Sequence, residues 1–355
     1  MDLAAYSHPF GSRGWSSPPN PPRARANARR PHRSRARSSD GPDAPGNAGE
    51  ERQGSLPRRI LLATDGSEDA ALAARAALDL SEACDAELHV VHVWTDARSA
   101  VHHPAAAVLG GRPHLRKEAG GVLREQAWNV RAEGGEVARA HLRRGRPAEE
   151  IVILAEELAA DLVVVGSRGR GASRQFLEGS VSEGVIRLAC CPTLIVRGGE
   201  GAWPPTRVVV GEDFSEDSGA AARLAVGVAG LFEARTLLLH AYPLLDLGHK
   251  APISGVFRIN GEVRATRGTL EGMAREIERE TGQLPDVRVS VGDVAACLLE
   301  AAGEEAGMPL VAVGGHGLGT PERPKVGGVC TKVVRGAWGP MLIHRRPGDR
   351  GGQVV

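Results

Sequence analysis

A chain of 355 residues with 42% hydrophobic and 3% aromatic residues has the size of two globular domains. Its net charge of +1 hides an asymmetry, because residues 1–39 hold eight arginines and one acid, which leaves 36 basic and 42 acidic residues elsewhere. No apolar run approaches the roughly 20 residues that span a membrane, and no signal peptide is visible. The five cysteines include no Cys-x-x-Cys pair, which disfavours a disulfide scaffold. We therefore expect a cytoplasmic protein without a membrane span.

The first 56 residues differ in composition from the rest of the chain. They are rich in Pro, Arg, Ser, Asn and Gly, as in SSPPNPPRARANARRPHRSRARSS. Such a segment buries too little apolar surface to offset its ordering entropy, so we expect a disordered tail. Clustered arginines also gain from counterion release, so nucleic acid is an expected partner only through this tail, and an organelle-targeting peptide is a further alternative.

From Arg59 onward, short apolar runs alternate with helical patterns. Ser67 is placed to cap a helix, and Pro147 suits the first turn of another. The run DLVVVG is continuously apolar, which is typical of a strand buried on both faces. The expected strands of this first half are 59–63, 86–93, 136–142, 161–166 and 193–197, and the expected helices are 67–83, 115–132, one from 147 onward, and 179–189.

The second half of the chain repeats the first. The segment RVVVGEDFSEDSGAAARLAVGVAGLFEARTLLLHAY from Arg207 aligns without gaps with RILLATDGSEDAALAARAALDLSEACDAELHVVHVW from Arg59, at an offset of 148. The expected strands of this half are 207–211, 235–241, 286–291, 310–314 and 341–345. We expect a tandem duplication with a disordered tail at 1–56, domains at 57–198 and 207–346, a linker at 199–206 and a C-terminal tail at 347–355.

Strand–helix alternation of this kind predicts an α/β fold of two Rossmann-like, doubly wound domains. We expect each domain to be a five-stranded parallel sheet of order 3-2-1-4-5 with helices on both faces. The last strand then lies at an exposed edge, and exposed edges invite pairing. We expect segments 193–197 and 341–345 to pair, so that the halves form a pseudo-dimer within the chain. Two chains can also form a homodimer through the remaining surfaces.

A candidate ligand site follows from this topology. Ligands of such sheets bind beyond the carboxyl ends of the strands, where the winding reverses. With the expected order, that place lies between strands 59–63 and 161–166, so Asp65 and Gly166 meet there. The loop from Val165 reads VGSRGRGASRQFLEGSV, which offers glycines, arginines and serines to an anion but lacks the Gly-Lys-Ser/Thr of a Walker loop.

At these residues the chain resembles a tandem universal stress protein, a family of small α/β domains that often bind ATP. The family signature Gly-x2-Gly-x9-Gly-Ser/Thr after strand 4 is matched without a gap, and the resemblance covers nearly all of residues 57–346. The resemblance implies an ATP site, with Mg²⁺ accompanying the nucleotide, and no resident metal. The implied site residues are Asp65, Val93, Gly166, Ser167, Arg168, Gly169, Gly179 and Ser180.

The equivalent loop of the second half departs from this signature. The residues that keep their spacing are Asp213, Gly314, Gly317 and Gly327. Gly328 replaces the hydroxyl residue, Pro321 and Pro324 remove two N–H donors, and Glu322 adds negative charge. We therefore expect triphosphate binding to be weakened or lost in this half.

Three functions remain open beside a nucleotide-linked sensor or regulator. The chain can be a nucleotide-free stress protein that acts on partners, a slow hydrolase related to adenine-nucleotide hydrolases, or an electron-transfer subunit that binds FAD or AMP. Fast phosphoryl transfer needs a metal clamp and a positioned acceptor, and the loop offers no evident base. No catalytic residue is therefore predicted.

Overall fold

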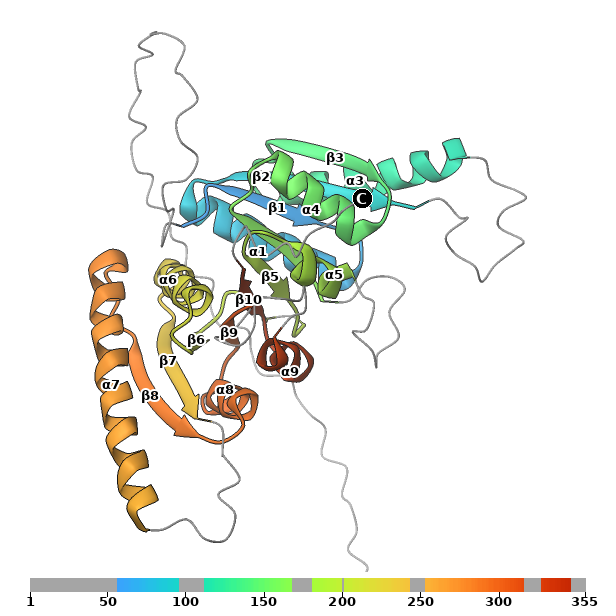
Figure 1. Cartoon of the computed structure of the whole chain (residues 1–355). Coiled ribbons are helices and arrows are strands. Elements are labelled where there is room, and N and C mark those ends of the chain that lie inside the picture. Colours follow the sequence, from blue (N-terminus) through green and yellow to red (C-terminus); the bar gives the residue numbers. More distant parts are fainter. Residues whose placement is uncertain are drawn as a thin grey trace, which may run out of the picture. The chain divides into compact units, whose positions relative to one another are not determined.

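The structure is a computed structural model that describes residues 56–95, 112–167, 181–199, 201–242, 253–315 and 327–345. The first half contains β1 (Arg59–Ala63), α1 (Glu68–Cys84), β2 (Glu87–Trp94), α3 (Arg112–Ala132), β3 (Arg139–Arg144), α4 (Pro147–Glu157), β4 (Leu162–Gly166), α5 (Val181–Leu188) and β5 (Thr193–Val196). The second half contains β6 (Arg207–Gly211), α6 (Glu216–Leu231), β7 (Arg235–Tyr242), α7 (Ile253–Thr281), β8 (Asp286–Val291), α8 (Val294–Gly303), β9 (Pro309–Gly314), α9 (Gly328–Gly336) and β10 (Met341–His344) (Figure 1). The predicted α/β fold is confirmed, whereas the expected tails at 1–56 and 347–355 lie almost wholly outside the described residues.

The strands join into one ten-stranded sheet of order β3-β2-β1-β4-β5-β10-β9-β6-β7-β8. Within each half all pairings are parallel, and each half has the predicted 3-2-1-4-5 order. The two edge strands meet in an antiparallel ladder, in which Leu342 lies opposite Leu194 and Met341 lies opposite Ile195. The predicted pairing of these two segments is therefore present.

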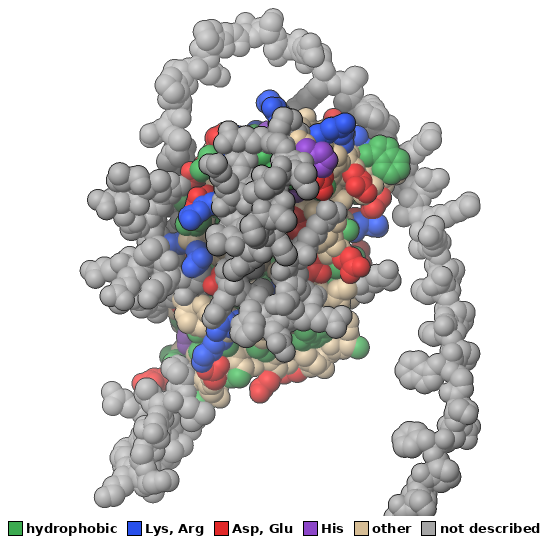
Figure 2. All heavy atoms as spheres, turned by 90° about the vertical axis from the view of Figure 1, so that its right-hand side faces the viewer, with side chains coloured by type: hydrophobic (Ala, Val, Ile, Leu, Met, Phe, Trp, Pro, Cys, Tyr) green, Lys and Arg blue, Asp and Glu red, His purple; other side chains and the backbone are tan. Residues whose placement is uncertain are grey.

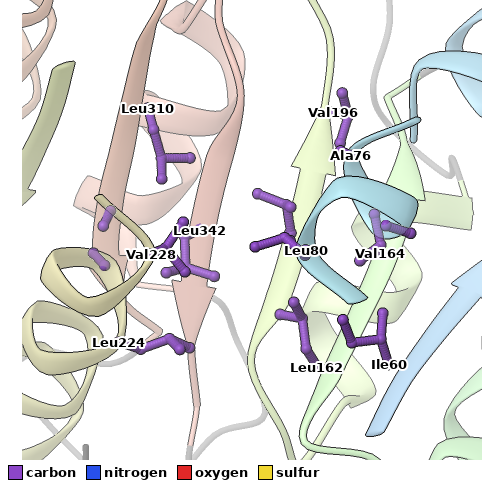
Figure 3. Close-up of a cluster of buried hydrophobic side chains, with 14 of the residues drawn as sticks. Ile60, Ala76, Leu80, Leu162, Val164, Val196, Leu224, Val228, Leu310 and Leu342 are labelled. Atoms are coloured by element: carbon purple, nitrogen blue, oxygen red, sulfur yellow. The ribbon is translucent and has the colours of Figure 1, made fainter. Parts of the chain in front are cut away.

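Side chains alternate across the sheet and feed two hydrophobic layers. On one face, helices α1, α3, α6 and α7 cover residues such as Leu62, Val164 and Leu342. On the other face, α4, α5, α8 and α9 cover residues such as Val165 and Ile195. Figure 3 shows the first layer, where side chains of β4, β5, β9 and β10 lie with those of α1 and α6. Both halves thus share a core across the β5–β10 seam.

Local signals set the ends of α1. The Ser67 hydroxyl accepts a hydrogen bond from the Ala70 N–H at 3.2 Å, and Glu68 and Asp69 place negative charge in the first turn. The helix ends where Asp85 adopts a left-handed conformation with φ of 53°. The prediction of a Ser67-capped helix is confirmed.

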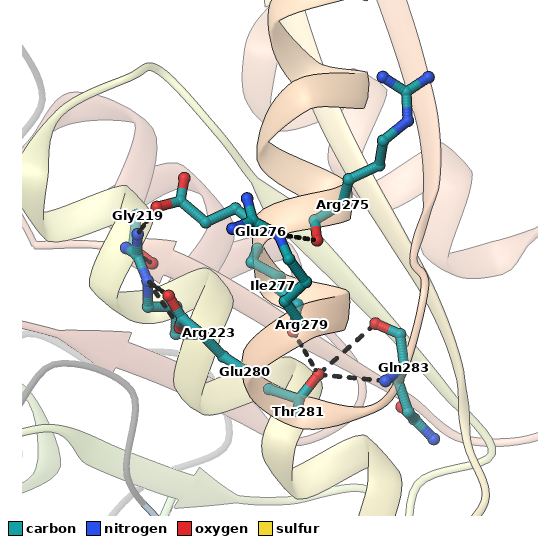
Figure 4. Close-up of polar contacts among 9 residues, drawn as sticks. All are labelled: Gly219, Arg223, Arg275, Glu276, Ile277, Arg279, Glu280, Thr281 and Gln283. Carbon is teal, nitrogen blue, oxygen red and sulfur yellow. Dashed lines mark hydrogen bonds and ion pairs between the residues drawn. The ribbon is translucent and has the colours of Figure 1, made fainter.

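The long helix α7 is held against α6 by one arginine. The Nε atom of Arg223 donates to Oε2 of Glu280 at 3.1 Å, and an Nη atom lies 3.8 Å from Oε1 of Glu276. The Arg223 side chain is only 17% exposed, so these ion pairs are shielded from much of the solvent. Figure 4 shows this contact together with Thr281, which closes the end of α7.

One strand begins three residues later than predicted and ends two residues later. The sequence predicts a strand at 136–142, whereas β3 spans Arg139–Arg144. The reason is that β3 is an edge strand of largely polar residues, RAHLRR, whose register depends on pairing with β2. The sequence at its boundaries therefore lacks the alternation of apolar and polar residues that would mark where the strand starts and ends.

No helix among the described residues is long and apolar enough to cross a membrane.

Candidate functional site

The candidate site lies at the carboxyl ends of β1 and β4. These strands are parallel neighbours with Ala63 opposite Val165, so the residues that follow them leave the sheet side by side. After β1 the chain enters α1 on one face, and after β4 it reaches α5 on the other. This reversal of the winding is the place where open α/β sheets bind ligands, and Asp65 and Gly166 lie at the ends of the two strands that flank it.

Asp65 shapes the loop between β1 and α1. Its Oδ1 atom accepts a hydrogen bond from the Ser67 N–H at 3.0 Å, and the side chain is half-buried. Gly66 has φ of 73°, a left-handed conformation that glycine adopts without strain. The Thr64 hydroxyl accepts from the Gly66 N–H at 3.2 Å, and the Thr64 carbonyl lies 2.7 Å from Nδ1 of His92. The carboxylate is thus fixed at the strand end.

Gly166 is required by packing. A Cβ atom there would lie 2.7 Å from the backbone C and O atoms of Asp69 and 2.9 Å from the Ala70 nitrogen. Gly314 shows the same approach, since its Cβ would lie 2.9 Å from the Ser218 nitrogen. Both glycines let the first turn of a helix touch the end of a strand, a role that the phosphate-loop signature did not indicate.

Ser167 links three elements of the site. It is 3% exposed, and its hydroxyl donates to Oδ2 of Asp69 at 2.6 Å. Its N–H donates to the Val196 carbonyl at 3.0 Å, and its carbonyl accepts from the Ser182 hydroxyl at 3.3 Å. Asp69 is a site residue that the sequence reasoning missed. Its only signal was an acidic side chain in the first turn of α1.

The remaining predicted residues divide into two groups. Val93 is on β2, where it lies opposite Arg143 of β3 and packs beside the second hydrophobic layer. The loop residues Arg168, Gly169, Gly179 and Ser180 lie outside the described residues, as does Gly317 of the second half. Helix α5 begins at Val181, directly after that loop.

The second half reproduces the backbone of this site. Oδ1 of Asp213 accepts from the Ser215 N–H at 3.1 Å, as Asp65 does from Ser67. The Ser215 hydroxyl accepts from the Ser218 N–H at 3.1 Å and caps α6. Gly327 has φ of −55° and precedes α9. Asp213 and Gly314 therefore occupy positions equivalent to those of Asp65 and Gly166.

A buried carboxyl distinguishes the second half. Glu212 stands where the first half has Thr64, and it is 3% exposed. Its Oε1 atom accepts from the Phe214 N–H at 2.7 Å and from the Ser218 hydroxyl, whereas Oε2 makes no hydrogen bond within the described part of the chain. Burial raises the pKa of Glu212 to about 7, against its ordinary value of 4.5.

An aromatic stack also marks this half. Phe214 replaces Gly66 and has φ of 64°, which is strained for a residue with a side chain. Its ring stacks on His240 with centroids 5.0 Å apart, and His240 meets Tyr242 edge-on at 4.8 Å. The end of β6 therefore carries a buried carboxyl and an aromatic stack, where the end of β1 carries Thr64 and Gly66.

We expect the Glu212→Gln variant to change the pH dependence of stability. Because the folded pKa of Glu212 lies above the unfolded one, its contribution is present below pH 4.5 and is lost as the pH rises through about 7. The variant should gain about 3 kcal/mol in free energy of unfolding relative to the wild type across that range. Urea denaturation between pH 4 and 8 measures the difference.

Comparing the variant with the wild type removes the contributions of other groups that titrate in this range. Burial lowers the pKa of His344 to about 4, so that histidine favours stability at higher pH, but it is present in both proteins. Stability curves that run parallel for wild type and variant would contradict the assignment of Glu212.

Comparisons with known proteins agree with the duplication. The model of the universal stress protein family matches residues 57–197 and again residues 205–345. A universal stress protein of Mycolicibacterium smegmatis is 29% identical over 300 residues, which is 81% of this chain and 96% of that protein. A solved universal stress protein from Archaeoglobus fulgidus has a TM-score of 0.57 at 22% identity and covers 82% of this chain and 99% of its own. A universal stress protein solved in complex with cAMP is 28% identical, covers 40% of this chain and 98% of its own, and has a TM-score of 0.32.

Proposed function

Because the chain belongs to the universal stress protein family, we propose that its first half binds ATP and that the chain acts as a nucleotide-linked sensor or regulator of a stress response. The observation that carries this proposal is the switch point between β1 and β4. There the Asp65 carboxylate, which is held by the Ser67 N–H, follows β1, and the start of the glycine loop follows the adjacent parallel strand β4. The domains of this proposal are residues 57–198 and 207–346, and the expected compartment is the cytoplasm.

The adenosine part of ATP would be held by acceptors at the strand ends. The Asp65 carboxylate offers a hydrogen-bond acceptor for ribose hydroxyls or the adenine amino group, and the Asx turn with Ser67 holds it in place. The backbone of Val93, at the end of the neighbouring strand β2, would read the adenine edge. The Asp65 carboxylate and the Val93 backbone fit the nucleotide, because ribose and adenine both present hydrogen-bond donors that need acceptors.

The phosphates would be held by the loop between β4 and α5. In this proposal Gly166 and Ser167 set where the loop leaves the sheet, and the backbone N–H groups of Gly169 and Gly179 and the Ser180 hydroxyl contact the phosphates. Arg168 would supply positive charge. The first N–H groups of α5 add donors and a favourable dipole. A bound triphosphate would hold Mg²⁺ through its own oxygens, because Mg²⁺ prefers oxygen ligands.

The test is titration calorimetry of the full chain with ATP and Mg²⁺. We expect a stoichiometry near one, because the second half lacks the hydroxyl at Gly328 and carries Pro321, Pro324 and Glu322 in its loop. Gly179→Val should weaken binding a hundredfold or more, because each lost hydrogen bond to a charged phosphate costs roughly 1.5–3 kcal/mol.

The matched control is Gly327→Val in the second half. Among the described residues, a Cβ atom at Gly327 meets only the Gly315 carbonyl, at 3.4 Å, so this part of the fold tolerates it. We expect this variant to bind ATP like the wild type. Two equal sites, or loss of binding in Gly327→Val alone, would contradict the assignment to the first half. Absence of binding in the wild type would favour a nucleotide-free protein that acts on partners, and release of phosphate with turnover would favour a slow hydrolase.

A further inference from the structure

A basic groove lies beside α3, next to the carboxyl end of β2. It has a volume of about 770 Å³ and is formed by the amino-terminal half of α3 and the carboxyl ends of β2 and β3. Small-molecule sites in proteins commonly have volumes of roughly 300–1,000 Å³. Its charged lining residues are all cations, namely Arg116, Lys117, Arg124 and Arg144. We call this feature the basic groove.

Three of these cations have no counter-charge in the described part of the chain. Within the described residues, Arg116, Lys117 and Arg124 make no hydrogen bond or ion pair, and all three are exposed. Other arginines nearby are paired, since Arg143 binds Glu157 and Arg146 lies 2.9 Å from Glu149. Figure 2 views the side on which α3 lies in Figure 1, and there Lys and Arg side chains are interspersed with Asp and Glu. Among the described residues, Arg116, Lys117 and Arg124 thus form a group of cations without counter-charges on a surface of mixed charge.

The groove also has an aromatic wall. Trp94 lies opposite Arg144 in the β2–β3 ladder, and the Arg144 guanidinium sits 5.7 Å from the centre of the Trp94 ring. This cation–π contact fixes one cation against the wall. Leu142 continues the apolar side of the groove. Cations beside apolar side chains attract a compact anion more strongly than cations on a fully hydrated surface do.

The floor of the groove is open because α3 carries a glycine there. A Cβ atom at Gly120 would lie 3.4 Å from an Nη atom of Arg124 and 4.0 Å from Cδ2 of Leu142. Glycine inside a helix costs about 1 kcal/mol relative to alanine. Gly120 therefore lowers the stability of α3, and the absence of a side chain at this residue leaves the groove unfilled.

The described residues of the second half do not reproduce the lining of this groove. Tyr242, which corresponds to Trp94, lies opposite Val291 instead of an arginine, and its hydroxyl bonds to Thr266 of α7. At the offset of 148, Lys117 and Arg124 correspond to Ala265 and Gly272. The groove is therefore not a by-product of the shared fold.

We propose that the basic groove binds a small polyphosphorylated molecule, separately from the nucleotide site at the switch point. Arginine suits phosphate because its planar donors bind two oxygens at once. Two or more phosphate groups are needed to satisfy cations contributed by both α3 and β3. None of the predicted nucleotide residues lines the groove, so this proposal does not depend on ATP binding.

The test uses inorganic tripolyphosphate and the full chain in the Gly179→Val background, so that the phosphate loop does not contribute. We expect one binding site by titration calorimetry, with an affinity that falls as salt rises. Arg116→Ser and Arg124→Ser should each weaken binding about tenfold, since a bond to a charged group is worth roughly 1.5–3 kcal/mol. Binding should change the tryptophan fluorescence, and Trp94→Phe should remove that change.

Two further variants separate the groove from general effects. Gly120→Met introduces a good helix former into α3 and fills the floor of the groove, so it should abolish binding without loss of thermal stability. Arg264→Ser removes the exposed arginine of α7 that corresponds to Arg116, and it should leave the affinity unchanged. Equal losses in Arg264→Ser and Arg116→Ser, or undiminished binding in Gly120→Met, would overturn the proposal. So would a twelve-nucleotide single strand that binds more than tenfold tighter than tripolyphosphate, since the ligand would then be nucleic acid.

Discussion

The Gly166→Ala variant is expected to lose about 3 kcal/mol of its free energy of unfolding. A single methyl group there would stand 2.7 Å from the backbone of Asp69, and backbone cannot swing away as a flexible side chain can. Helix α1 must shift from the end of β4, which disturbs the hydrogen bond from Ser167 to Asp69. Urea denaturation followed by far-UV circular dichroism measures the loss.

Two matched glycines calibrate this result. Gly314→Ala should cost less, because the contacts there begin at 2.9 Å. In Gly121→Ala, inside α3, the added methyl group meets no atom of the described residues within 4 Å, so the variant should gain up to about 1 kcal/mol of unfolding free energy. A Gly166→Ala variant as stable as the wild type would show that α1 is free to move, and the packing role of this glycine would be wrong.

The Ile195→Pro variant is expected to lose at least about 4 kcal/mol of unfolding free energy. Ile195 is 1% exposed and lies between Val165 of β4 and Met341 of β10. Proline removes a backbone N–H donor in the middle of the sheet and leaves a cavity where the isoleucine packed. Because β5 is the only bridge from the first-half strands to the second-half strands among those described, we expect a larger radius of gyration by small-angle scattering.

A cross-link distinguishes lost pairing from general unfolding. Leu194 and Leu342 lie opposite each other and belong to the same hydrophobic layer. Cysteines at both positions should form a disulfide on oxidation, since opposed antiparallel residues lie within about 5.5 Å. Cysteines at Leu194 and Ile343 should not, because Ile343 belongs to the other layer. Peptide mapping by mass spectrometry reads the outcome, and equal cross-linking of both pairs would contradict the β5–β10 register.

Much of the fold could be predicted because it is encoded locally and then repeated. Continuous apolar runs such as LVVVG identified β4, and Ser67 identified the start of α1. The duplication supplied a second copy of each signal, and the strand order followed from the α/β alternation. The pairing of β5 with β10 could be predicted because the topology leaves those two edges without partners. Strand β3 was misplaced because a polar edge strand takes its register from its neighbour.

Less of the site could be predicted, since its contacts join distant segments. The bond between Ser167 and Asp69 spans 98 residues, and neither side chain has a spacing that announces the other. The sequence reasoning assigned Gly166 to phosphate, whereas its closest neighbours are backbone atoms of α1. Glu212 and the basic groove had no signal, because burial of a carboxyl and convergence of four cations arise only after folding.

The antiparallel seam between β5 and β10 sets where the two crevices lie. Because all strands within a half are parallel, the strands of the two halves run in opposite directions through the common sheet. The loops that follow β1 and β4 therefore emerge at one end of the sheet, and those that follow β6 and β9 emerge at the other. The two ends of the sheet are therefore two poles of different chemistry, and a molecule bound over one crevice would contact that half alone. Duplication has thereby freed one pole to diverge, with its buried Glu212 and exposed Phe214, while the other keeps the intact glycine signature.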